Sequence, residues 1–239
     1  MGKIPDSICI LGAGPSAAGF ALRRTLKLKA EDGALLVLDY QGRGASILTE
    51  ELSESLARRP VKWYDLADRS RPTALFHLGH SSHFPDTIRS LLHRLKEILP
   101  FRVSSGTLEW AVKAADRLSE SGAVGLAALH KTLSDPIARR WFLDTQNDPA
   151  DFSRLLQMFA WMLRFPAVYA LSEGNNRVRL AEELATASTL WIEANLEHFE
   201  RYEHRIVTIL VEAVVEDALK TIAAGGNGDS AKRFSALRN

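Results

Sequence analysis

A turn of small residues between two apolar runs constrains this chain more than any other feature of its sequence. The first run is Ile8–Leu11, and the second is Ala34–Leu38, which is closed by Asp39. Both runs are continuously apolar rather than alternating, as is typical of parallel strands covered on both faces. Between them, Ser16–Leu28 is rich in good helix formers. Residues 7–40 therefore predict a strand, a turn, a helix and a second, parallel strand.

The turn has the composition of a phosphate-binding loop. Its residues are nearly all small: Gly12, Ala13, Gly14, Pro15, Ser16, Ala17, Ala18 and Gly19. Such a turn lets several backbone N–H groups point at one anion, and the N-terminus of the following helix adds a favourable dipole. The alternative is a tight strand-to-helix connection that binds nothing. We expect the phosphate cradle, because so many small residues are rarely needed only to turn a chain.

One interpretation of the turn is a dinucleotide site. Gly12, Gly14 and Ala17 fit the pattern G-x-G-x-x-G/A. Asp39 ends the second strand, where an acidic side chain accepts a hydrogen bond from a ribose hydroxyl. The segment GAGPSAAGFAL resembles the FAD-binding start of many flavoproteins, which implies a Rossmann domain that holds FAD or NAD(P) in an oxidoreductase. A flavoprotein would also need a further glycine-containing FAD segment and a substrate domain, and we find neither in residues 80–220.

A second interpretation is a degenerate P-loop, whose full pattern is G-x-x-x-x-G-K-[ST]. Counted from Gly12 or from Gly14, neither the lysine nor the hydroxyl residue is present. Without the lysine the β- and γ-phosphates lose a charge partner, and without the hydroxyl a Mg²⁺ ion loses a ligand. We therefore expect a site that takes ATP or ADP weakly and hydrolyses ATP poorly.

Five segments of the chain follow one another in an order that resembles a known family. A long helical stretch separates the third segment from the fourth. They are LLVLDYQGRG at 35–44, RRPVKWYDLAD at 58–68, RPTALFHL at 71–78, RVRLAEELATASTLWIEAN at 177–195 and IVTILVEAVVEDAL at 206–219. This order resembles the motor domain of type IV coupling proteins and their FtsK/HerA-type relatives, which pump DNA. The resemblance implies a nucleotide-binding α/β domain. Because the P-loop is degenerate, it also implies a pseudo-ATPase that acts as a structural or regulatory subunit.

These patterns together predict the domain organisation. We expect one α/β domain over residues 1–224, with a mainly parallel sheet, helices on both faces and a helical insertion at about 84–172. Residues 225–239 are polar and glycine-rich, which predicts a disordered tail. The partners implied are other protein subunits, with nucleic acid contacted only through the assembly.

Composition excludes several classes of function. Lys plus Arg number 30 and Asp plus Glu 29, so the formal net charge of +1 argues against a domain that coats nucleic acid. The single cysteine, Cys9, excludes an intrachain disulfide and a cysteine-based zinc site. We find no secretory leader and no run of 18 apolar residues, so we expect no membrane span and a cytoplasmic location.

Two groups of titratable residues invite a metal hypothesis. The first is the histidine series His77, His80 and His83, for which we expect a polar surface loop rather than a metal site. The second is the acidic series Glu197, Glu200 and Glu203, which lacks the Glu-x-x-His spacing of di-metal bundles. For the acidic series we expect a solvated helix face balanced by neighbouring arginines.

Overall fold

The computed structural model describes residues 8–11, 35–40, 61–76, 83–120, 122, 124–143, 149–174, 176–186, 189–195 and 199–225. The chain divides into two compact units. We call residues 1–68, 179–199 and 221–239 the sheet unit, and residues 69–178 and 200–220 the helical unit. The protein has a mixed α/β fold in which helices dominate.

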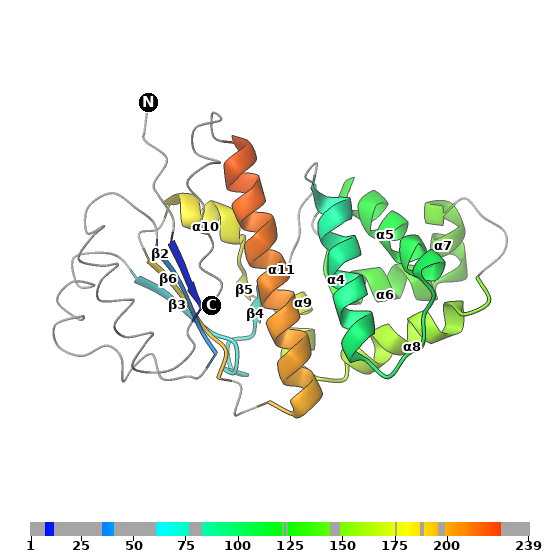
Figure 1. The fold of residues 1–239 in the computed structure, drawn as a ribbon, viewed down its shortest axis with the longest axis horizontal. Helices are drawn as coiled ribbons and strands as arrows, with labels where there is room; N and C mark the ends of the chain where they lie inside the picture. The colour runs from blue at the N-terminus through cyan, green and yellow to red at the C-terminus, as the bar shows by residue number, and fades with distance from the viewer. Residues whose placement is uncertain are drawn as a thin grey trace. The chain divides into compact units, whose positions relative to one another are not determined.

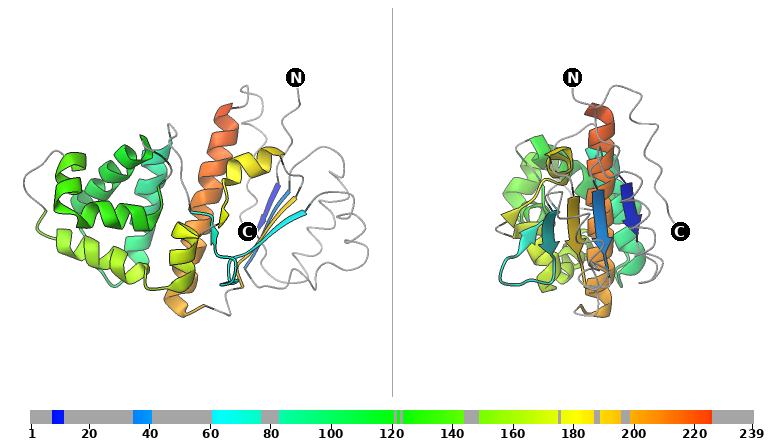
Figure 2. Two further views of the ribbon diagram at one scale, coloured as in Figure 1. Left: turned by 180° about the vertical axis from the view of Figure 1, so that it is seen from behind. Right: turned by 90° about the vertical axis from the view of Figure 1, so that its left-hand side faces the viewer.

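Four parallel strands form the centre of the sheet unit. They are β1 (Ile8–Leu11), β2 (Leu35–Asp39), β3 (Val61–Asp65) and β6 (Thr189–Glu193). Their order across the sheet is β1-β2-β6-β3, so a strand from late in the chain lies between two early ones (Figure 2). All three neighbouring pairs are parallel, as the continuous apolar runs predict.

Burial explains why these segments form strands. Leu36, Leu38, Leu190 and Ile192 are each at most 3% exposed. Full burial of such a side chain contributes about 1.5–3 kcal/mol. Short β-branched and leucine-rich runs meet this requirement on both faces of a parallel sheet.

A short helix lies against the sheet in the same unit. This helix is α10 (Leu180–Thr186), which contacts β6 (Figure 1). Its Glu183 forms an ion pair with Lys62 of β3. The hydrogen bond that the Lys62 ammonium donates to Glu183 raises the pKa of Lys62. The pKa of Tyr64 is also raised, mainly by burial and then by the charge of Glu183. The odd-numbered side chains of β3, such as Trp63, therefore lie on the sheet face opposite α10.

The helical unit contains a bundle of helices and one very small sheet. Its helices are α4 (Phe84–Ile98), α5 (Ser105–Glu120), α6 (Leu126–Ser134), α7 (Pro136–Leu143), α8 (Phe152–Met162) and α9 (Pro166–Glu173), together with α11 (Arg201–Gly225) as far as residue 220. Figure 1 shows α4 to α8 gathered side by side. The small sheet pairs β4 (Thr73–Ala74) with β5 (Asn176–Arg177).

Amphipathic periodicity builds the core of this unit. Along α4, the side chains of Ile88, Leu91, Leu92 and Leu95 recur at helical spacing, and each is at most 1% exposed. They pack beside α5, whose Leu108 is fully buried. On the outer side of the pair, Arg89 of α4 binds Glu109 of α5 with an Nε–Oε1 distance of 2.7 Å.

Local capping agrees with the sequence at the start of α7. Pro136 is its first residue, as the Ser134-Asp135-Pro136 segment predicts. The Oδ1 atom of Asp135 accepts a hydrogen bond from the backbone N–H of Ile137 at 2.8 Å. An acidic cap of this kind satisfies an N–H group that has no partner inside the helix.

The segment Ala74–Leu78 predicts a short strand, and this prediction is wrong in its extent. Only Thr73–Ala74 pairs as a strand, and residues 77 and 78 lie outside the described residues. The backbone N–H of Phe76 instead donates to the carbonyl of Leu171 in α9, at 2.9 Å. This bond takes the chain out of the ladder, so the apolar side chains are buried without forming a longer strand.

Candidate carboxyl-edge site

The carboxyl ends of the four parallel strands lie at one edge of the sheet unit, which we call the carboxyl edge. Leu11, the last residue of β1, is in register with Leu38 of β2, so β1 ends one residue before the level of Asp39. The glycine-rich turn follows Leu11 in the sequence. Asp39 is in register with Glu193, and Glu193 with Asp65. Three acidic residues therefore end three adjacent strands at the same level. In open α/β sheets this is the edge at which ligands bind.

Backbone hydrogen bonds hold these strand ends firmly. The carbonyl of Asp39 accepts from the N–H of Ala194 at 2.8 Å, and the carbonyl of Glu193 accepts from the N–H of Leu66 at 2.8 Å. The ladder thus continues one residue past the acids on two of the strands. A rigid edge of this kind gives a ligand a fixed set of groups to meet.

The three acids differ in their surroundings. Asp39 is only 9% exposed, whereas Asp65 and Glu193 are half-buried. The Oδ1 atom of Asp65 accepts from the N–H of Ala67 at 2.8 Å and so fixes its own turn. Among the described residues, no group of three histidine, cysteine or acidic side chains is arranged to hold a metal ion. The acids at the carboxyl edge therefore do not form a metal site by themselves.

Two tryptophans precede the acids on neighbouring strands, a feature that sequence reasoning missed. Trp63 and Trp191 are in register, and their rings stack with centroids 4.8 Å apart and an interplanar angle of 4°. Trp191 is 1% exposed, whereas Trp63 is 39% exposed. A signal was present, because VKWYD and TLWIE each carry a tryptophan two residues before a terminal acid. Since side chains alternate along a strand, this spacing puts each tryptophan on the same face as the acid that follows it.

The sequence-predicted site residues are only partly described. Gly12, Ala13, Gly14, Pro15, Ser16, Ala17, Ala18 and Gly19 lie outside the described residues, and Asp39 is described. The expected helix over 16–28 also lies outside them, as do residues 226–239 of the expected tail. The segment 48–58, which also predicts a helix, is not described either. The phosphate cradle therefore stays a prediction, and the structure gives the position of the strand that enters it.

The acidic series near α11 differs from its prediction. Helix α11 begins at Arg201, so Glu200 precedes it, and Glu197 lies outside the described residues. Glu203 is 4% exposed, and its Oε1 accepts from the N–H of Ala167 at 2.9 Å, in the first turn of α9. The expectation of a solvated face is wrong for Glu203, because its carboxylate binds a buried N–H at another helix's N-terminus.

The structure describes only some of the histidines and aromatic residues that the sequence singles out. His77 and His80 lie outside the described residues, and His83 directly precedes α4. The aromatic residues between Trp141 and Phe165 recur at helical spacing, which predicts a core or a partner surface. Of these, Phe152 and Phe159 are buried, while Trp141 is 81% exposed. Phe152, Phe159 and Trp141 all belong to the helical unit.

Comparison with known proteins finds no match to this chain, either among protein families, among curated proteins or among solved structures. Among the described helices, none is long and apolar enough to span a membrane alone, although α8 and α9, bent by 96°, reach that length and composition as a pair.

Proposed function

We propose that this protein is a nucleotide-binding domain of the kind found in DNA-translocating P-loop ATPases, without hydrolytic activity, and that it acts as a structural or regulatory subunit of a larger assembly. The observation that carries the proposal is the carboxyl edge. There, β1 ends one residue before the level of Asp39 of the neighbouring strand, and a turn of small residues follows it in the sequence. Phosphates in α/β proteins are held by turns in this position.

The negative charges at the carboxyl edge indicate which groups would contact each part of a nucleotide. Carboxylates repel a bare phosphate, so phosphate contacts would come from the backbone N–H groups of the turn. Asp39, Glu193 and Asp65 would face the sugar or a cation that accompanies the nucleotide. Hydrolysis would be slow, because the chain has neither the P-loop lysine nor the adjacent hydroxyl.

The strand order differs from that of a standard dinucleotide domain. The usual order of a dinucleotide-binding sheet is 3-2-1-4-5-6, in which the second strand lies between the first and the third. Here β2 lies between β1 and β6, and β6 separates β2 from β3. The inserted strand comes from the segment 177–195, which is one of the segments that carry the resemblance to the DNA-pumping motors.

One observation favours a second candidate function, an FAD- or NAD(P)-binding domain of an oxidoreductase. Asp39 ends the strand beside β1, which is where a dinucleotide fold has the acid that binds ribose. Colour separates the candidates, because a purified flavoprotein absorbs near about 450 nm. If NAD(P) is the ligand, Asp39→Asn should weaken its binding by about tenfold or more, because the ribose loses its charged acceptor.

The test is titration of the purified protein with ATP, ADP, FAD and NAD(P), with and without Mg²⁺. We expect ATP and ADP to bind and to raise the melting temperature, with ATP turnover well below the roughly 1 s⁻¹ that ordinary enzymes reach. Gly12→Val should abolish binding, because a branched side chain would block the approach of the phosphate to the turn. Gly106→Val is the matched control, since a Cβ there meets only the Ser104 hydroxyl, at 3.9 Å.

Two outcomes would contradict the proposal. If the folded wild-type protein binds none of the four nucleotides, the turn is only a structural connection. If it hydrolyses ATP at the rate of a working motor, the degenerate P-loop interpretation is wrong. Melting curves of both glycine variants keep loss of binding separate from loss of folding.

A further inference from the structure

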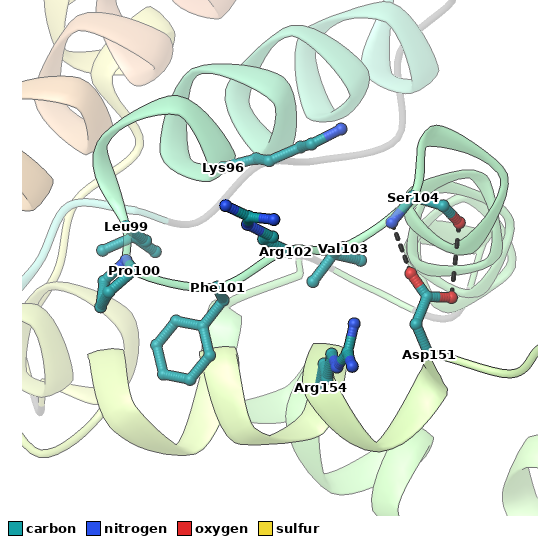
Figure 3. Close-up of a pocket in the computed structure, with 9 residues that line it drawn as sticks. All are labelled: Lys96, Leu99, Pro100, Phe101, Arg102, Val103, Ser104, Asp151 and Arg154. Carbon is teal, nitrogen blue, oxygen red and sulfur yellow. Dashed lines mark hydrogen bonds between the residues drawn. The ribbon is translucent and has the colours of Figure 1, made fainter.

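A hollow in the helical unit lies between the C-terminal end of α4 and the first turn of α8 (Figure 3). Its volume is about 620 Å³, within the range of sites that take small organic ligands. Leu99 and Val103 form its apolar floor and are 7% and 2% exposed. All its lining residues belong to the helical unit, so the hollow is separate from the carboxyl edge.

Three cationic side chains line this hollow from three different segments. Lys96 comes from the last turn of α4, Arg102 from the loop after it, and Arg154 from the first turn of α8 (Figure 3). Arg102 and Arg154 are exposed, and Lys96 is half-buried. Within the part of the chain that the structure describes, none of the three forms an ion pair. Other cations of this unit are paired, such as Arg89 with Glu109 and Arg94 with Glu212.

The one acidic residue among those that line the hollow, Asp151, already accepts hydrogen bonds from neighbouring groups. Asp151 accepts hydrogen bonds from the backbone N–H and the hydroxyl of Ser104 (Figure 3). It also accepts one from the hydroxyl of Thr107. These donors hold the pKa of Asp151 below its ordinary value, with the Thr107 hydroxyl as the main cause. Its carboxylate oxygens therefore bind groups at the N-terminus of α5, and among the described residues Asp151 forms no ion pair with the three cations.

The same bonds make the hollow rigid before any ligand arrives. Asp151 ties the start of α8 to Ser104, and Ser104 in turn accepts from the N–H of Thr107 at 3.1 Å. At the other end of the loop, the N–H of Leu99 donates to the carbonyl of Leu95 at 3.1 Å. The loop that carries Arg102 is thus fixed at both ends, which lowers the entropic cost of binding.

We propose that this hollow binds the phosphoryl group of a small phosphorylated organic molecule, held by Lys96, Arg102 and Arg154. Guanidinium groups match phosphate oxygens with paired, charge-assisted hydrogen bonds, and the lysine adds a point charge. Phe101 lines the same hollow and provides an aromatic wall for the organic part of the ligand. Its ring is fixed edge-on against Trp161, with centroids 5.8 Å apart.

The size and charge of the surroundings favour a compact ligand over a nucleic-acid strand. A strand needs a basic track that follows its backbone over several nucleotides. Here the three cations line one hollow, and the whole chain has a formal net charge of only +1. The two arginines of α4, Arg89 and Arg94, form ion pairs with acidic side chains.

The test uses phenyl phosphate, the simplest phosphate ester with an aromatic ring, in calorimetric titrations of the full chain. We expect it to bind more tightly than inorganic phosphate and phenol not to bind detectably. Arg102→Gln and Arg154→Gln should each weaken binding by about tenfold, which is about 1.4 kcal/mol. Lys131→Gln, on an exposed lysine of α6 away from the hollow, should leave the affinity unchanged.

Melting temperatures and competing ligands separate phosphoryl binding from misfolding and from binding of nucleic acid. Arg102 and Arg154 are exposed and make no ion pair with described residues, so their glutamine variants should keep the wild-type melting temperature. Gly12→Val should still bind phenyl phosphate, because its turn is not part of the hollow. Equal affinities for the arginine variants and Lys131→Gln would overturn the proposal. Tighter binding of a single-stranded oligonucleotide than of phenyl phosphate, lost in the same arginine variants, would overturn the assignment to a small molecule.

Discussion

Substitution of the buried Glu203 tests whether its carboxylate is a structural anchor. Its bond to the N–H of Ala167 involves a charged acceptor and a buried donor, which is worth about 1.5–3 kcal/mol. The carboxylate also lies at the N-terminus of α9, where a negative charge adds about 0.3–1 kcal/mol. Glu203→Ala removes both and leaves the N–H without an acceptor. We therefore expect a loss of about 3 kcal/mol in the free energy of unfolding.

Circular dichroism during urea and thermal unfolding measures this loss. At about 2–4 °C per kcal/mol for a chain of this length, the melting temperature should fall by about 6–12 °C. Glu203→Gln keeps an acceptor oxygen and nearly the same volume, so it should lose only about 1 kcal/mol. Glu200→Ala is the matched control, because Glu200 is exposed and should change stability by less than about 0.5 kcal/mol. The reasoning is refuted if the two alanine variants unfold at the same urea concentration.

Three further substitutions probe other features. Gly174→Ala should destabilise the fold by about 2 kcal/mol or more, because a Cβ there would lie 2.5 and 2.7 Å from backbone atoms. Gly106→Ala should not, because its Cβ would meet only the Ser104 hydroxyl, at 3.9 Å. Urea unfolding compares the two variants. Burial raises the pKa of Asp217, so the folded state binds its proton more tightly than the unfolded chain, and this group's contribution to stability falls as pH rises above about 3.8. Asp217→Asn should therefore gain stability relative to wild type between about pH 4 and pH 7, and a constant difference across that range would contradict the assignment. Trp63→Ala should lose about 2 kcal/mol and the near-ultraviolet dichroism of its stack on Trp191, and an unchanged spectrum would argue against a fixed stack.

The strands of the sheet unit could be predicted from sequence because their signal is local. Continuous apolar runs predicted strands close to Ile8–Leu11 and Leu35–Asp39 and their parallel pairing. The segments 61–66 and 189–194 also predict short strands, close to the observed Val61–Asp65 and Thr189–Glu193. The order of the strands could not be predicted in this way. The apolar run of β6 fits next to any of the other strands, and only the assembled fold selects the place between β2 and β3.

Features that depend on distant partners were missed or misjudged. The charges around Glu203 suggested a solvated helix face, but its partner is an N–H group 36 residues away in the sequence. The cations Lys96, Arg102 and Arg154 share one hollow only because the fold brings the end of α4, the loop after it and the start of α8 to the same place. At the carboxyl edge, the sequence pointed to Asp39, while the alignment of Asp65 and Glu193 with it depends on the register of three strands.

The late arrival of β6 in the chain has a consequence for biosynthesis. β2 ends at residue 39 and β6 begins at residue 189, so 150 residues of translation separate them. At about 5–20 residues per second, the ribosome needs roughly 8–30 s to make this stretch. During that time one edge of β2, with its leucines, has no native neighbour to pair with. Open apolar strand edges are templates for aggregation, so the nascent chain should depend on chaperones until β6 closes the sheet.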